Sequence, residues 1–183
     1  MNKIGLFFGT ETGTTRLIAK KIHKLLGDDN AAKPVNVNRT TPEEFLRYEA
    51  LILGIPSYGD GALPGRSVNC IEANWEEFLQ QLNETDLSGK RIALFGLGAQ
   101  ERYADTFASS MMPLYRALKD YGAEMVGDWS IEGYQFKHSA SVENGRFVGL
   151  VIDQRTQGML TDERLKAWVG QIKPALVIVQ PDG

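Results

Sequence analysis

The chain has 183 residues and a mass of 20.3 kDa, which is the size of one ordinary domain. Its 43% apolar and 23% charged residues lie near the average of globular proteins and exclude a disordered or fibrous chain. A formal net charge of −3 argues against a nucleic-acid-binding protein, and the single cysteine, Cys70, excludes an internal disulfide framework and multi-cysteine metal sites.

No apolar run reaches the roughly 20 residues that a membrane-spanning helix needs. The segment MNKIGLFFGTET at the start of the chain lacks the long apolar core and the small-residue cleavage site of a signal peptide. We therefore expect a cytoplasmic protein without a membrane partner.

Short apolar runs alternate along the chain with longer helical patterns. Lys3–Gly9, Ala50–Pro56 and Arg91–Gly98 are continuous apolar runs that end in glycine or proline. Such runs are typical of strands that a parallel sheet buries on both faces. Val35–Asn38 is more polar and predicts an edge strand.

Apolar residues recur at helical spacing in four segments, which predicts four amphipathic helices. The four stripes are Ile18, Ile22, Leu25 and Leu26; Trp75, Phe78, Leu79 and Leu82; Phe107, Met111, Leu114 and Leu118; and Leu165, Trp168, Val169 and Ile172. We expect Pro113 in the first turn of the third helix, where a missing N–H costs little. Asp162 and Glu163 are favourably placed near the positive end of the last helix.

The alternation of strands and helices predicts a doubly wound α/β domain with right-handed crossovers, spanning residues 1–183. Residues 128–147 interrupt this alternation of strands and helices, because they are rich in turn formers and polar groups. Phe147–Asp153 then has the pattern of a strand again. We therefore expect an insertion of roughly 20 residues that splits the last strand.

Doubly wound sheets bind ligands beyond the carboxyl ends of their strands. The loops to consider are therefore Thr10–Thr15, Ser57–Gly61 and Leu97–Phe107. The first of them, within Gly9–Thr15, runs from a buried strand into an amphipathic helix, whose free N–H groups and positive partial charge attract phosphate. It lacks the lysine of a nucleoside-triphosphate loop and the G-x-G-x-x-G of dinucleotide sites.

The residues that follow Gly9 offer only uncharged donors, namely threonine hydroxyls and backbone N–H groups, which suits a small mononucleotide. The alternative is a threonine-rich N-cap without a ligand. In the other two loops, Tyr58 and Tyr103 could stack on opposite faces of a flat ring, and the backbone near Gly98 could hydrogen-bond a uracil-like edge. Taken alone, either tyrosine would be an ordinary half-buried aromatic residue.

These residues together resemble the flavodoxins, small electron carriers that hold FMN. The resemblance rests on KIGLFFGTETGTT, LILGIPSYGDG, IALFGLGAQERYAD, GDWSIEGYQF, NGRFVGL and LTDERLKAWVGQI, which cover essentially the whole chain. It implies a three-layer sandwich around a five-stranded parallel sheet of order 2-1-3-4-5. The excursion after Trp129 resembles the insertion of the long-chain subgroup.

The resemblance also implies which residues hold FMN. The phosphate loop matches Thr10, Glu11, Thr12, Gly13, Thr14 and Thr15; the loop on one ring face matches Ser57, Tyr58, Gly59, Asp60 and Gly61; the loop on the other face and the pyrimidine edge matches Leu97, Gly98, Ala99, Tyr103, Thr106 and Ala108. Ala99, Thr106 and Tyr58 stand where many members of the family have Asp, Asn and Trp.

The implied function is that of a low-potential one-electron carrier, in which non-covalently bound FMN shuttles between semiquinone and hydroquinone. The implied partners are a flavodoxin/ferredoxin reductase as donor and other redox proteins that dock at the exposed flavin edge. Ala62–Leu79 resembles the flavodoxins of nitrogen-fixing bacteria, which makes the nitrogenase iron protein the expected acceptor. We expect a monomer that has neither catalytic residues nor a metal site.

Two hypotheses concern how the protein would tune the flavin. The first is that the Gly59–Asp60 peptide turns its carbonyl toward flavin N5–H after one-electron reduction, since glycine makes the rotation easy. The second is that acidic groups such as Asp60 lower the potential of the second electron. The acids Asp60, Glu72, Glu76, Glu77, Glu101 and Asp105 could also steer basic partners to the site.

The alternative function is an FMN-dependent NAD(P)H quinone reductase on the same fold, for which no dedicated loop is evident. A receiver domain of a response regulator needs clustered acidic residues after its first strand and a phosphate-accepting aspartate after its third. The corresponding segments here are FFGTET and LGIPSYG, which excludes such a domain. Cys70 is expected to be an exposed loop thiol.

Overall fold

A computed structural model describes residues 3–58 and 60–177 of the chain. Its central sheet is parallel and has the order β2-β1-β3-β4-β5. A sixth strand, β9, follows β5 along the same edge of β4 and pairs with the later residues of β4. The strands are β1 (Gly5–Phe8), β2 (Val35–Asn36), β3 (Ala50–Ile55), β4 (Arg91–Leu97), β5 (Glu124–Val126) and β9 (Leu150–Ile152). The predicted strand order and the edge position of the second strand are confirmed.

The central strands read as unbroken apolar runs because both of their faces are covered. In β3, Leu51 and Leu53 point into one buried cluster and Ile52 points into the other, as the two-residue period of a strand requires. All six residues of β3 are buried. The hydrophobic core therefore lies in two layers, one on each face of the sheet.

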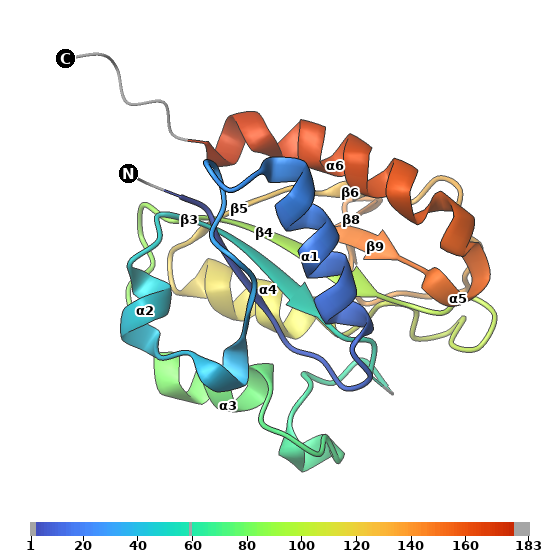
Figure 1. The fold of residues 1–183 in the computed structure, drawn as a ribbon. Helices are drawn as coiled ribbons and strands as arrows, with labels where there is room; N and C mark the ends of the chain where they lie inside the picture. The colour runs from blue at the N-terminus through green and yellow to red at the C-terminus, as the bar shows by residue number, and fades with distance from the viewer. Residues whose placement is uncertain (1–2, 59, 178–183) are drawn as a thin grey trace.

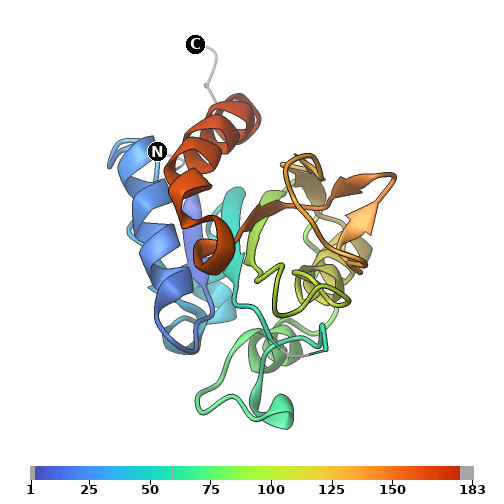
Figure 2. The same ribbon diagram turned by 90° about the vertical axis from the view of Figure 1, so that its right-hand side faces the viewer.

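Helices cover both faces and complete the predicted three-layer sandwich (Figure 1, Figure 2). One face carries α1 (Thr14–Leu26) and α6 (Thr161–Leu176), and the other carries α2 (Pro42–Leu46), α3 (Trp75–Leu82) and α4 (Met111–Asp120). Shorter pieces are α5 (Gln154–Gln157) and 3-10 turns at Val37–Arg39, Arg66–Val68 and Gly158–Leu160. None of the helices in the described part of the chain is long and apolar enough to span a membrane.

The apolar stripe of α6 is buried throughout, as predicted, but two expectations for the other helices are wrong. Leu25 is 44% exposed, because the part of α1 that faces the sheet is covered by Ile18, Ile22 and Leu26. Phe107 lies before α4 instead of inside it, since Ala108 adopts a left-handed conformation with φ of 49° and the helix begins only at Met111.

The last strand is split, as predicted. β5 pairs with Arg91–Ala93 and β9 pairs with Phe95–Leu97, so the two pieces lie end to end along β4. The position just before β9 accommodates only glycine, because a Cβ on Gly149 would lie 2.3 Å from the carbonyl oxygen of Leu94. The strand expected over Phe147–Asp153 is therefore shorter, and Phe147 belongs to a different sheet.

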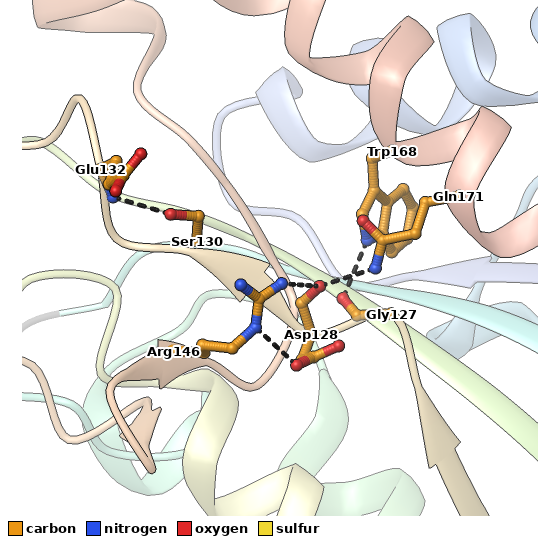
Figure 3. Close-up of polar contacts among 7 residues, drawn as sticks. All are labelled: Gly127, Asp128, Ser130, Glu132, Arg146, Trp168 and Gln171. Atoms are coloured by element: carbon orange, nitrogen blue, oxygen red, sulfur yellow. Dashed lines mark hydrogen bonds and ion pairs between the residues drawn. The ribbon is translucent and has the colours of Figure 1, made fainter.

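Residues 127–149, which we call the insertion, form a small antiparallel sheet of β6 (Trp129–Ser130), β7 (Val142–Glu143) and β8 (Arg146–Phe147). The start of the insertion is fixed to α6 (Figure 3). Trp168 Nε1 donates to the Gly127 carbonyl at 2.9 Å, and Gln171 Nε2 donates to the Asp128 carbonyl at 2.8 Å. Arg146 from β8 closes the arrangement by an ion pair of 2.7 Å with the Asp128 carboxylate.

Candidate functional site

Three loops meet at the carboxyl edge of the sheet because β1, β3 and β4 are parallel neighbours. We call residues 10–15 the first loop, residues 57–61 the second loop and residues 98–110 the third loop. The arrowhead of β3 points toward the start of α1, where the first loop ends (Figure 1). These are the loops in which the sequence places its candidate residues.

The first loop turns sharply and leads directly into α1. The backbone N–H of Gly13 donates to Thr10 Oγ1 at 3.0 Å, and the carbonyl of Gly13 accepts the first hydrogen bond of the helix from Leu17 at 3.1 Å. Gly13 has a φ of 93°, and a Cβ there would meet no atom within 4 Å. The left-handed backbone, and not crowding, therefore favours glycine at this position.

The N-terminus of α1 has no cap within the described chain. The N-cap residue is Gly13, which has no side chain that could accept a hydrogen bond from the N–H groups of the first turn. That turn also contains no acidic residue. Thr15 in this turn is 1% exposed, and its Oγ1 has no hydrogen-bond partner among the described residues. An unpaired buried hydroxyl costs free energy, so this turn is suited to a ligand that supplies an acceptor. Thr12 and Thr14 hold their hydroxyl oxygens 3.4 Å apart beside it.

Asn74 supports the first loop from the neighbouring helix α3. A Cβ at Gly9 would lie 1.8 Å from Asn74 Oδ1, and Asn74 Nδ2 donates to the Thr10 carbonyl at 3.5 Å. Asn74 is also the N-cap of α3 and forms a capping box with Glu77. Sequence reasoning missed this residue, although the spacing Asn-x-x-Glu before an apolar stripe is a readable sign of a capped helix.

The second loop is a tight turn, and the third loop packs against it. The N–H of Gly61 donates to the Tyr58 carbonyl at 3.1 Å, and Ser110 Oγ donates to the same carbonyl at 3.2 Å. Gly61 has a φ of 83°, and a Cβ there would lie 2.6 Å from Ser109 Cβ. Ser57 and Asp60 are exposed and Tyr58 is half-buried. Gly59 lies outside the described residues.

Cys70 is buried between the first two loops, so the expectation of an exposed thiol is wrong. Its side chain is 5% exposed and lies close enough to the side chains of Tyr58 and Glu11 to interact with both. Burial, together with the charge of Glu11, raises the pKa of the Cys70 thiol to about 11. Desolvation, and then the neighbouring Cys70, raises the pKa of the Tyr58 hydroxyl. At neutral pH Cys70 is thus a thiol that joins the first loop to the second.

The third loop begins where β4 ends at the half-buried Leu97. The N–H of Gly98 donates to Ile152 at 3.1 Å, and the carbonyl of Ala99 accepts from the N–H of Tyr103 at 2.9 Å. The N–H of Thr106 donates to the Tyr103 carbonyl at 3.3 Å, which closes a second turn. The Tyr103 ring is 37% exposed, with the Arg102 guanidinium 5.5 Å from its centre.

Ala108 near the end of the third loop is 4% exposed, and its carbonyl accepts a hydrogen bond of 2.7 Å from Ser141 Oγ of the insertion. The described site residues thus belong to three loops that contact one another. Cys70 connects the first loop to the second, and Ser109 and Ser110 connect the second to the third.

Comparison with known proteins agrees with this arrangement. The family model described as Flavodoxin matches residues 6–168. The chain is 51% identical to a flavodoxin of Klebsiella pneumoniae over 94% of this chain and 98% of that protein. It is 48% identical to a flavodoxin of Enterobacter agglomerans over 97% of this chain and 100% of that protein.

Among solved structures, the chain is similar to a Fusobacterium nucleatum flavodoxin bound to flavin mononucleotide, with 32% identity and a TM-score of 0.84. This match covers 97% of this chain and 100% of the other. None of these relatives supports the quinone reductase alternative. With a family match across residues 6–168 and relatives matched over nearly their whole length, the chain belongs to the flavodoxin family.

Proposed function

We propose that this flavodoxin binds FMN without a covalent bond at the carboxyl edge of its sheet and carries single electrons between other proteins. Membership of a family of electron carriers supports the transfer role, and the similar Fusobacterium flavodoxin is bound to FMN. The observation that carries the proposal is the buried Thr15 hydroxyl, which has no hydrogen-bond partner in residues 3–58 and 60–177, at the start of α1, where Gly13 supplies no side-chain cap. Bound FMN would supply the redox chemistry, and the chain would hold and tune it.

The first loop would hold the phosphate through the hydroxyls of its threonines and its free backbone N–H groups. No lysine or arginine lies between Gly9 and Thr15, so the attraction comes from dipoles at a helix N-terminus. The residues proposed for this role are Thr10, Glu11, Thr12, Gly13, Thr14 and Thr15. A phosphate there would supply the acceptor that Thr15 Oγ1 lacks.

The other two loops would enclose the ring. Tyr58 would cover one face together with the rest of the second loop, and Tyr103 would cover the other face. The remaining proposed contacts are Ser57, Gly59, Asp60 and Gly61 in the second loop, and Leu97, Gly98, Ala99, Thr106 and Ala108 at the end of β4 and in the third loop. The hydrogen bond from Ser110 to the Tyr58 carbonyl supports the pairing of these loops.

Thr15→Val tests the phosphate contact because it replaces the hydroxyl by a methyl group of similar size. We expect FMN to bind about tenfold more weakly, as for the loss of one hydrogen bond to a charged group. Riboflavin, which lacks the phosphate, should bind with unchanged affinity. Fluorescence titration of the apoprotein measures both. Thr161→Val, at a buried threonine that begins α6, is the control and should change neither affinity.

An equal loss of riboflavin and FMN affinity in Thr15→Val would place the phosphate elsewhere. A wild-type protein that binds no FMN would overturn the proposed function itself.

We further assign the chain to the long-chain subgroup and propose a monomer that receives electrons from a flavodoxin/ferredoxin reductase and passes them to the nitrogenase iron protein. The split last strand supports the subgroup, and the resemblance of Ala62–Leu79 to flavodoxins of nitrogen-fixing bacteria supports the acceptor. Stopped-flow mixing of the reduced protein with oxidised iron protein tests the acceptor. Transfer no faster than to an unrelated redox protein would reject it.

A further inference from the structure

Gln100 is a buried residue in an otherwise exposed part of the third loop. It is 3% exposed, whereas the three residues that follow it, Glu101, Arg102 and Tyr103, are exposed. A buried side-chain amide is costly unless its polar atoms are paired. The partners of Gln100 therefore show what the residue holds in place.

Gln100 pairs its backbone N–H and both ends of its amide with three different segments. Its backbone N–H and its Nε2 donate to the same oxygen of Asp153, Oδ2, at 2.9 and 2.8 Å. Nε2 also donates to Gln157 Oε1 at 2.8 Å, and Oε1 accepts from the backbone N–H of Gln135 in the insertion. One side chain thus joins the third loop to the end of β9, to α5 and to the insertion.

Asp153 is itself fixed, so it gives Gln100 a rigid support. The side chain is 1% exposed, and its second oxygen, Oδ1, accepts from the N–H of Thr156 at 2.8 Å as the N-cap of α5. A buried carboxylate with three N–H donors is a strong and well-oriented acceptor. Moving Gln100 away would leave part of this acceptor unpaired.

The insertion holds the same loop from the other side. The carbonyl of Ala104 accepts from the N–H groups of Lys137 and His138 at 2.8 and 3.0 Å, and the His138 carbonyl accepts from the N–H of Phe107 at 3.1 Å. The start of the insertion is fixed to α6 through Trp168 and Gln171 (Figure 3). The third loop is therefore supported at both its first and its last turn.

We propose that Gln100 is a positioning residue, which holds the third loop in the shape required to cover the flavin before the flavin arrives. This inference rests on the proposed function, since it assumes that the third loop covers the ring. A loop that is ordered in advance loses little conformational freedom when the ligand binds, whereas a loosened loop must be ordered at the expense of affinity. Gln100 acts through the loop and does not itself touch the ligand.

Gln100→Leu removes the amide at nearly constant volume and tests the inference. We expect at least about tenfold weaker binding of both FMN and riboflavin, with faster release of each, because the ring contacts and not the phosphate contacts are loosened. This differs from Thr15→Val, for which only FMN binding falls. Gln81→Leu is the matched control, because it removes a glutamine amide from an exposed position of α3 that has no part in holding the third loop, and it should keep wild-type affinity.

Gln100→Glu gives a readout that a general loss of stability would not produce. When ionised, the introduced carboxylate faces Asp153 and the Gln157 carbonyl oxygen, and both contacts are repulsive. When protonated, it can donate to Asp153 as the native amide does. The segments that meet at Gln100 carry further charged residues, namely Glu101 and Arg102 in the third loop, Arg155 in α5, Glu132 and Lys137 in the insertion, and Arg164 in α6, whose guanidinium lies 4.0 Å from the Tyr134 ring centre.

We therefore expect the riboflavin affinity of Gln100→Glu to recover toward the wild-type value as the pH is lowered from 8 to 5.5. Riboflavin is the probe because it has no phosphate that titrates in this range. Wild-type and Gln81→Leu proteins should show no such recovery.

Riboflavin binding by Gln100→Leu within twofold of wild type, or a flat pH profile for Gln100→Glu, overturns the inference. If Gln100→Leu does not fold, the pH profile of Gln100→Glu decides alone. A wild-type protein that binds neither FMN nor riboflavin instead overturns the proposed function, so the two failures are distinguishable.

Discussion

Asp60 and Gln100 illustrate two ways in which single residues could serve a flavin site. Gln100 is buried and fully hydrogen-bonded, and its proposed role is to hold backbone in place. Asp60 is exposed in the second loop, and its proposed role is to act by its charge across space. The two roles predict different measurements, since positioning changes affinity and charge changes the reduction potential.

Asp60→Asn should raise the second one-electron potential of bound FMN. A unit negative charge near the ring disfavours the addition of a further electron, and at about 10 Å with solvent screening the effect is on the order of tens of millivolts. A reductive titration followed by absorbance measures it. Asp29→Asn removes the same charge beyond the far end of α1 and should leave the potential unchanged. Equal second potentials in Asp60→Asn and wild type would show that Asp60 does not tune the flavin.

At the scale of the element, α1 and α3 begin in opposite ways. α3 is closed by a capping box, in which Glu77 Oε2 accepts from the N–H of Asn74 at 2.9 Å. Glu77 Oε1 also accepts from the N–H of Arg66 at 2.8 Å, which holds the preceding turn against the helix. α1 has only Gly13 at the same position. The helix that is capped by its own chain supports the first loop, and the helix without a side-chain cap is the one proposed to bind the phosphate.

Glu77 should make the stability of the protein sensitive to acid. Partial burial alone would raise the pKa of Glu77, but the backbone N–H groups of Asn74 and Arg66 outweigh it, so the pKa is lowered in the folded state. Its contribution is therefore complete above the unfolded pKa of about 4.3 and is lost as the pH falls through the lower, folded value.

Glu77→Gln should cost about 1 kcal/mol of unfolding free energy at pH 7. Urea unfolding of the apoprotein between pH 7 and 3 measures this difference, which should shrink below about pH 4. Glu132→Gln, at an exposed position of the insertion, is the control. A difference that is constant down to pH 3 would contradict the assignment.

At the scale of the whole molecule, acids around the three loops give the carboxyl edge a negative field. Asp60, Glu101 and Asp105 are exposed there. Glu72, Glu76 and Glu77 instead bind locally, to Asn38, Ser67 and the start of α3 respectively. The first three acids are therefore the better candidates for steering a basic partner, because their exposed carboxylates are not held by a local contact and form no ion pair among the described residues.

Electron transfer to a basic redox partner should slow several-fold as salt is raised, because the screening length falls from about 30 Å at 0.01 M to about 8 Å at 0.15 M. A variant with Asp60→Asn, Glu101→Gln and Asp105→Asn should transfer more slowly at low salt and lose most of this dependence. Stopped-flow rates across this range measure it. An unchanged salt slope in the triple variant would show that these acids do not steer.

The sequence predicted the elements whose cause is local. The unbroken apolar run of β3 predicted a strand buried on both faces, and the turn-rich residues 128–147 predicted the split last strand. The strand order came from the resemblance to the flavodoxins. The first loop was recognisable because its glycine and threonines lie between a strand and a helix within a few consecutive residues. The ring-covering roles of Tyr58 and Tyr103 stay predictions.

What local patterns could not reveal are contacts between residues far apart in the chain. Gln100 and Asp153 are separated by 53 positions and meet only because β9 lies beside β4. Cys70 is buried because its loop folds back onto Tyr58 and Glu11, and Phe107 leaves the helical pattern to pack beside Phe136 of the insertion. The sequence by itself determined the parallel strands and the loop that could receive a phosphate, because backbone preferences and burial patterns act over neighbouring residues. Only the tertiary structure decided how the third loop is held, because a hydrogen bond between distant segments produces no recurring pattern in the sequence of either segment.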